Sequence, residues 1–115
     1  MVAWKDAREP ARALTAAMPL IKAKRVVVAE INEGQPSAND APAVTAQLAW
    51  HGVRAEPRTV RTDHRPIAAL LSSVAESCCA DLLVMGSYGK GPMREEIFGG
   101  CTQSMLNHAV PVFVL

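Results

Sequence analysis

The stretch DLLVMGSYGKGPMREEIFGGCT, residues 81–102, decides the fold that we expect for this chain. Its apolar run 82–85 is typical of a buried strand, and the run stops abruptly at Gly86. Glycines allow the backbone to adopt positive φ and to approach a ligand closely. A helix that begins near Gly99 would present free N–H groups to an anion. A strand, a glycine loop and a helix start, in this order, therefore predict a phosphate-binding turn.

The glycines of this stretch also have a specific spacing. Gly86, Gly89 and Gly99 fit the pattern G-x2-G-x9-G. This pattern resembles the nucleotide loop of the universal stress protein family, and the tail SMLNHAVPVFVL, residues 104–115, resembles the last helix and strand of that family. The resemblance extends more loosely over the whole chain. It departs from the family pattern at Gly100, where the family usually has Ser or Thr.

Apolar patterning predicts strands and helices in strict alternation. Three valines at 26–28 indicate a strand buried on both faces, and an apolar stripe over 67–78 predicts the clearest helix. Such alternation is typical of a parallel sheet with helices on both faces. The expected strands cover residues 2–4, 25–31, 54–61, 82–85 and 110–115. The expected helices are one that starts after Asp6 and is kinked or ended by Pro19, then 43–51 (after a loop over 32–42), 67–78 and 99–108.

Two classes of doubly wound strand order are compatible with this alternation. The resemblance implies the order 3-2-1-4-5, in a three-layer α/β/α fold of the adenine nucleotide alpha hydrolase-like type. Pro57 and Pro111 agree independently, because proline in a sheet is confined to edge strands or strand starts. In this order the first and fourth strands are neighbours at the topological switch point, where ligands bind at the carboxyl ends of strands.

The resemblance implies where a nucleotide would lie. The phosphates would bind the loop at Gly86 and Gly89 and the backbone N–H groups of residues 99–102, where Thr102 matches a second Ser or Thr position of the family. Met85 and Tyr88 match positions that line the family's pocket. The complete set of expected nucleotide-binding residues is Trp4, Lys5, Met85, Gly86, Tyr88, Gly89, Gly99, Gly100, Cys101 and Thr102.

Several of these residues have alternative interpretations. Met85 suits the core end of a strand, and Trp4 either stacks on adenine, as Tyr88 would, or packs at an apolar strand end. Lys5 occupies the position where nucleotide-binding members of the family usually have Asp, so it either pairs with a phosphate as a point charge or is a solvated surface residue. A thiol pKa tends to fall at a helix start, which makes Cys101 a candidate for redox chemistry. The small apolar residue that the family usually has there favours packing instead.

Composition narrows the class of protein. The chain has 115 residues, which suits one domain, and a formal net charge of +1 with no basic block, which argues against a nucleic-acid partner. No apolar run has membrane-spanning length, and we expect a cytoplasmic protein. Its three cysteines fit neither a disulfide framework nor a zinc pattern, and a vicinal disulfide between Cys78 and Cys79 would strain a helix. The chain begins almost inside its first strand, which indicates a truncated start or one half of a tandem protein.

Three functions follow as expectations. The first is a stress-response regulatory domain that binds ATP or a related nucleotide, with or without Mg. No base, nucleophile or pair of metal-binding carboxylates converges on the glycine loop, so we expect no enzyme, or at most slow ATP hydrolysis. The alternative is an interaction module with a degenerate pocket that forms a homodimer through the last strand, Val110 to Leu115. An enzyme of the adenylate-forming or electron-transfer type is the third.

Overall fold

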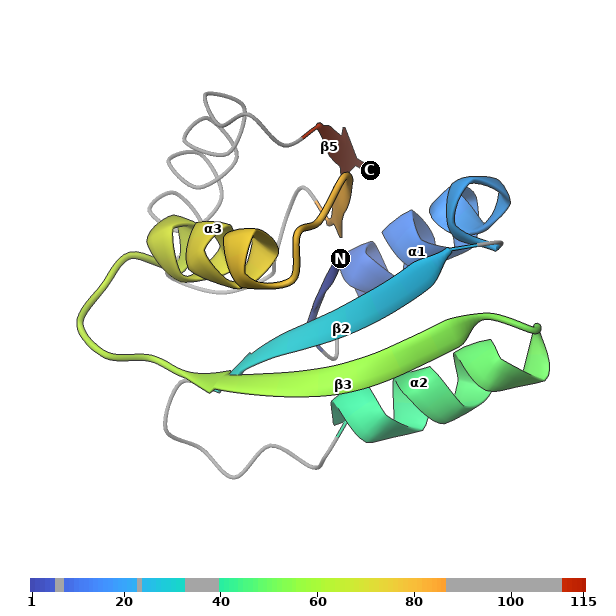
Figure 1. Cartoon of the computed structure of the whole chain (residues 1–115), viewed down its shortest axis with the longest axis horizontal. Helices are drawn as coiled ribbons and strands as arrows, with labels where there is room; N and C mark the ends of the chain where they lie inside the picture. The colour runs from blue at the N-terminus through green and yellow to red at the C-terminus, as the bar shows by residue number, and fades with distance from the viewer. Residues whose placement is uncertain (6–7, 23, 33–39, 87–110) are drawn as a thin grey trace.

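The computed structural model describes residues 1–5, 8–22, 24–32, 40–86 and 111–115, with the side chain of residue 114 left out. Strands and helices alternate as expected from residue 2 to residue 85 (Figure 1). The elements in chain order are β1 (Val2–Trp4), α1 (Arg8–Ile21), β2 (Arg25–Asn32), α2 (Asp40–Trp50), β3 (Arg54–Arg61), α3 (Ile67–Ser77), β4 (Leu83–Met85) and β5 (Val112–Val114). The expected helix over 99–108 lies outside the described residues.

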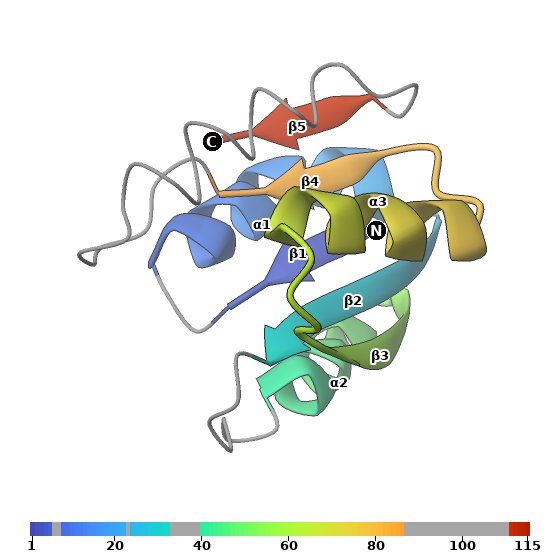
Figure 2. The same ribbon diagram turned by 90° about the vertical axis from the view of Figure 1, so that its left-hand side faces the viewer.

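The strands form one parallel sheet in the order β3-β2-β1-β4-β5, which confirms the expected order (Figure 2). β3 and β5 are the edge strands, so Pro57 and the proline before β5 stand where a missing N–H is tolerated. β1 lies at the centre of the sheet and pairs with β2 on one side and β4 on the other. Successive strands are added on one side of β1 up to β3 and on its other side from β4 onward, so the switch point falls between β1 and β4.

The helices divide the core into two apolar clusters, one on each face of the sheet. α1 and α2 cover one face, where buried residues of both helices pack on Val2, Val28 and Val84. α3 covers the other face, where Leu71 packs on Leu83. Figures 1 and 2 show α3 on the opposite side of the sheet from α1 and α2. The three-layer α/β/α arrangement is therefore present. No described helix has both the length and the apolar character needed to cross a bilayer.

The start of α2 and the end of α1 differ from the expectation. α2 begins at Asp40, inside the expected loop, because the buried Glu30 Oε2 accepts a hydrogen bond of 3.2 Å from the Ala41 N–H and so fixes the first turn. Pro42 is tolerated there, since first-turn N–H groups have no partner within the helix. Pro19 does not end α1, which continues to the buried Ile21. Packing of that last turn offsets the hydrogen bond that Pro19 cannot donate.

Candidate functional site

The switch point brings four of the expected site residues to one end of the sheet. Val2 pairs with Val84, so the parallel register continues to Ala3 beside Met85 and Trp4 beside Gly86. Lys5 follows Trp4 and is exposed. The remaining expected residues lie outside the described ranges: Tyr88, Gly89, Gly99, Gly100, Cys101 and Thr102.

Gly86 has a packing role that the sequence analysis did not anticipate. A Cβ at this position would lie 2.8 Å from the backbone carbon of Glu9 and 2.8 Å from the nitrogen of Pro10. Its φ is outside the left-handed region, so positive φ is not what requires glycine here. The first turn of α1 packs directly against the end of β4, and only a residue without a side chain allows that approach. Gly86 therefore allows the first turn of α1 to contact the end of β4, whether or not a ligand is bound.

Trp4 and Met85 lie on opposite faces of the sheet. Met85 is buried with Leu71 and Leu83 in the cluster under α3, where only 3% of it is exposed. Trp4 packs against the cluster under α1 and α2. The reason is the register: Val2 pairs with Val84, and successive residues of a strand face opposite sides, so Trp4 shares the face of Val2 and Val84 while Met85 takes the other. Met85 is therefore a core residue, as one of its two interpretations predicted. Trp4 is the apolar residue on the other face, near Gly86.

The indole nitrogen of Trp4 is a buried donor for which the described residues supply no acceptor. Trp4 is half-buried, yet its Nε1 is shielded from solvent and donates to no group in the part of the chain that the structure describes. Buried polar groups are almost always hydrogen-bonded, because leaving one unpaired costs about 1–3 kcal/mol. The orphaned N–H therefore marks a place where an acceptor from a ligand would be favourable.

Glu30 is a polar residue of this region that sequence reasoning missed. It pairs with Trp4 in the parallel register of β1 and β2, and only 5% of it is exposed. One of its oxygens accepts the Ala41 N–H at the start of α2, so the carboxylate positions the wall beside Trp4. The sequence did contain a signal for this buried carboxylate. Glu30 is an acidic residue in a strand, RVVVAEIN, whose other residues predict burial on both faces. Charged residues are almost never buried without a partner.

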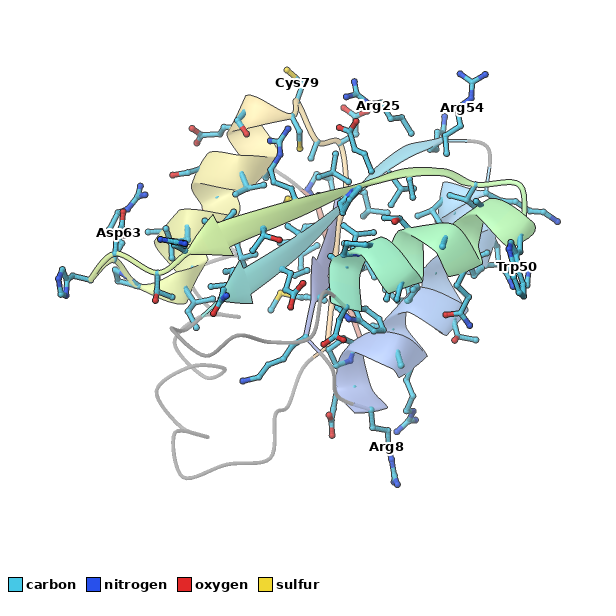
Figure 3. The ribbon with its side chains drawn as sticks, turned by 90° about the horizontal axis from the view of Figure 1, so that it is seen from below. Arg8, Arg25, Trp50, Arg54, Asp63 and Cys79 are labelled. Carbon is cyan, nitrogen blue, oxygen red and sulfur yellow. The ribbon has the colours of Figure 1, made fainter. Side chains whose placement is uncertain are left out.

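Charged groups of both signs lie at this end of the sheet, with Glu9 in the first turn of α1 and Asp40 in the first turn of α2. Lys5 after β1 and Arg8 at the start of α1 are both exposed, and Figure 3 shows Arg8 projecting from the end of the molecule where α1 begins. Among the described residues, no three His, Cys, Asp or Glu side chains gather in a way that could hold a metal ion. Besides these carboxylates and that of Glu30, the described groups offer a hydrogen-bond donor, an aromatic ring and the two exposed cations. Such groups suit an anionic aromatic ligand.

Comparison with known proteins gives a consistent result. Residues 2–115 match the sequence model of the Universal stress protein family. No protein among those with curated descriptions matches the chain.

Several solved structures share the fold. A protein of the universal stress protein family from Burkholderia pseudomallei aligns with a TM-score of 0.73 and 20% identity over 99% of this chain and 93% of its own. A universal stress protein from Archaeoglobus fulgidus DSM 4304 aligns with a TM-score of 0.76 and 24% identity over 98% of this chain and 41% of its own. A universal stress protein solved in complex with cAMP aligns with a TM-score of 0.74 and 20% identity over 99% and 92% of the two chains.

Proposed function

This chain belongs to the universal stress protein family, and from that premise we propose that it is a regulatory domain of the stress response that binds ATP or a related nucleotide. The phosphates would lie on the glycine loop after β4, at Gly86 and Gly89 and at the helix start over 99–102. The base and ribose would lie toward the ends of β1 and β2. A relative with the same fold was solved with cAMP, which supports a nucleotide as the ligand class.

The observation that carries this proposal is the orphaned indole N–H of Trp4 at the switch point. Ligands of doubly wound folds bind where the strand order reverses, and this donor is buried at that place without an acceptor. Ring nitrogens and ribose oxygens of a nucleotide are acceptors, so they fit it. Lys5, next in the chain, would supply a point charge to a phosphate, in place of the carboxylate that nucleotide-binding members of the family usually have there.

We propose binding without fast turnover. The described side chains at this end supply a hydrogen-bond donor and a cation, and the carboxylate nearest in register, Glu30, already accepts the Ala41 N–H. General-base catalysis needs a group within hydrogen-bond reach of the attacking water and with a suitable pKa. The domain would therefore hold ATP, with Mg brought by the nucleotide, and hydrolyse it slowly at most. The free thiols of Cys78 and Cys79 suit the reducing cytoplasm that we propose as its location.

Calorimetric titration of the nucleotide-stripped domain with Mg-ATP, and separately with cAMP, tests this function. We expect saturable heat with at least one of them, and its loss in Gly89→Val. Gly91→Val is the control, because Gly91 lies in the same segment but outside the G-x2-G-x9-G pattern. Trp4→Phe keeps an aromatic ring and removes Nε1–H, so it should weaken binding roughly fivefold, the effect of one hydrogen bond of about 1 kcal/mol.

Fluorescence offers a second readout of the same event. Trp4 and Trp50 are the two tryptophans of the chain, and Trp50 is 90% exposed on α2. In a Trp50→Phe background the emission therefore comes from Trp4 alone, and nucleotide binding should change it. Absence of both heat and a fluorescence change with either nucleotide at millimolar concentration would refute nucleotide binding.

A second candidate function is homodimerisation, which the position of β5 favours. β5 is an edge strand. Its backbone pairs with β4 through the Pro111 carbonyl, which accepts the Leu83 N–H at 2.9 Å, and through the Leu115 N–H. The N–H and C=O groups of successive residues in a strand point to opposite sides. Since Pro111 and Leu115 bond to β4, the N–H and C=O groups of Val112 and Val114 point to the open edge. Such an edge is a template for a second strand, and we propose that it pairs with a second copy of this chain.

A further inference from the structure

A cavity lies at the amino ends of the strands, at the opposite end of the sheet from the nucleotide site. Its volume is about 390 Å³, and its lining includes Cys78 and Cys79 from the turn after α3, and Lys24 and Arg25 from the start of β2. Figure 3 shows Cys79 and Arg25 on the same side of the molecule and Arg8, at the start of α1, on the other. Two nucleophilic side chains thus line one cavity that the nucleotide proposal leaves unused.

The helix ends one residue before the expected end at Cys78, so Cys78 caps it and Cys79 follows it. α3 ends at Ser77, with Cys78 as its C-cap. The Ala80 N–H donates to the Ala75 carbonyl at 2.9 Å, and the Cys79 N–H donates to the Glu76 carbonyl at 3.1 Å. This pair of bonds is a Schellman motif, in which the residue after the cap is left-handed and usually glycine. These capping bonds fix the backbone of Cys78 and Cys79 at the end of α3, in a turn and not in a helical conformation.

Cys79 occupies this glycine position with a φ of +51°. Left-handed backbone is unfavourable for a residue with a Cβ, so glycine would fit better there. The Cys79 side chain does not compensate by packing, because the residue is exposed. Cys78 is half-buried, and its thiol donates to the Ala75 carbonyl over 3.5 Å. A thiol at position 79 thus brings no structural benefit that the described contacts reveal, but it does place a second sulfur next to Cys78.

The geometry favours a bridging ligand over a direct disulfide. Neighbouring Cα atoms are about 3.8 Å apart across a trans peptide, whereas disulfides usually join Cα atoms about 4.4–6.8 Å apart. An atom held between the two sulfurs, with bonds of roughly the 2.3 Å found for zinc–thiolate, lets the sulfurs stay farther apart. The described residues offer no third His, Cys, Asp or Glu ligand, which does not suit four-coordinate zinc.

We propose that Cys78 and Cys79 form a vicinal dithiol site for thiophilic electrophiles that need only two sulfur ligands, with monosubstituted trivalent arsenicals as the ligand class. In the reaction both S–H bonds and the arsenic–oxygen bonds break, and two arsenic–sulfur bonds form. The two thiol protons leave with the oxide oxygen as one molecule of water. Arsenic remains trivalent, so the step needs no oxidant or reductant. This site is independent of the nucleotide proposal.

The test uses the reduced full chain and phenylarsine oxide, with the adduct measured by native mass spectrometry. We expect one arsenical per chain, stable to excess monothiol and removed by a 1,2-dithiol, because only chelation by two sulfurs resists a monothiol. Cys78→Ser and Cys79→Ser should each lose the stable adduct. Cys101→Ser should retain it, since Cys101 is the third cysteine of the sequence.

The Cys79→Gly variant tests whether loss of the arsenical adduct is caused by loss of the second thiol or by unfolding of the protein. Glycine suits the left-handed position, so the equilibrium constant for unfolding should fall roughly fivefold in chemical denaturation while the adduct is lost. An adduct that requires Cys101, that persists in Cys78→Ser or Cys79→Ser, or that a monothiol removes would overturn the proposal. Absence of any adduct in the wild-type chain would overturn it as well.

Discussion

At the scale of single residues, two buried polar groups decide how this fold presents a binding site. Glu30 is satisfied in part by the Ala41 N–H and so fixes where α2 begins. Trp4 Nε1 donates to no described group. The two residues are register partners on β1 and β2, yet among the described residues only the carboxylate makes a hydrogen bond that explains its burial. An orphaned donor costs free energy in the empty protein and regains it when a ligand supplies an acceptor.

A second residue-scale feature is the exposed ion pair that precedes α3. Arg65 Nε donates to both oxygens of Asp63, at 2.8 and 2.9 Å, and this side-chain hydrogen bonding holds the pKa of Asp63 below its ordinary value. Because the folded pKa is lowered, the pair contributes stability above the ordinary Asp pKa. That contribution is lost as the pH falls through the lowered value.

We expect Arg65→Gln to return the Asp63 pKa toward its ordinary value, measured by the carboxyl carbon chemical shift in an acid titration. Arg65→Lys keeps the charge and loses the planar fork, so it should give an intermediate pKa. Unchanged titration of Asp63 in Arg65→Gln would show that the pair does not persist in solution.

At the scale of elements, the contact between α1 and β4 controls the shape of the switch point. Gly86 ends β4 against the backbone of Glu9 and Pro10, both in the first turn of α1. A glycine in a nucleotide-loop motif therefore has a second role inside the protein. Any substitution there changes the fold and the site together, so a binding test at Gly86 would confuse the two effects.

We expect Gly86→Ala to destabilise the protein by about 1–3 kcal/mol, because the new methyl group must displace the backbone of α1. Guanidinium denaturation measures the loss, and amide hydrogen exchange should be faster in α1. Gly52→Ala is the control. It has no atom within 4 Å of its added Cβ and a φ of +76°, so it should cost about 1–2 kcal/mol through the backbone alone and leave α1 protected. Wild-type stability of Gly86→Ala would contradict the packing argument.

At the scale of the whole molecule, the sheet order sets both the ligand site and the exposed edge. The central position of β1 places its end beside β4, and the outer position of β5 leaves one row of backbone groups unpaired within the described chain. The proposed nucleotide site and the proposed dimer edge thus follow from one topology. They belong to different strands, and variants can separate them.

We expect Val112→Pro to abolish a dimer formed through β5, because it removes an N–H directed to the open edge and leaves the Pro111 and Leu115 bonds to β4. Val112→Ala is the control: it trims the same side chain and keeps the N–H, so the dimer should remain. Analytical ultracentrifugation over a range of concentrations measures the equilibrium. A wild-type chain that stays monomeric at high concentration, or a Val112→Pro chain that stays dimeric, would refute this interface.

The amino-acid sequence alone identified the family and predicted an alternating parallel sheet. It left two classes of strand order open, and the resemblance to the family implied the order 3-2-1-4-5, with which Pro57 and Pro111 agreed. These properties depend on apolar periodicity, glycine spacing and proline placement, which are local features of the chain. Of the expected site, it also identified the residues that the switch point brings together, Trp4, Lys5, Met85 and Gly86, while the others lie outside the described ranges.

The surroundings of those residues became known from the three-dimensional arrangement of the elements. It showed Met85 and Trp4 on opposite faces, Gly86 against α1, Glu30 at the start of α2, and Cys78 and Cys79 beyond the end of α3. Each of these facts depends on the register between strands or on a contact between segments distant in sequence, such as Glu9 with Gly86. No local pattern encodes such contacts, because they arise when separate elements pack and exclude water together.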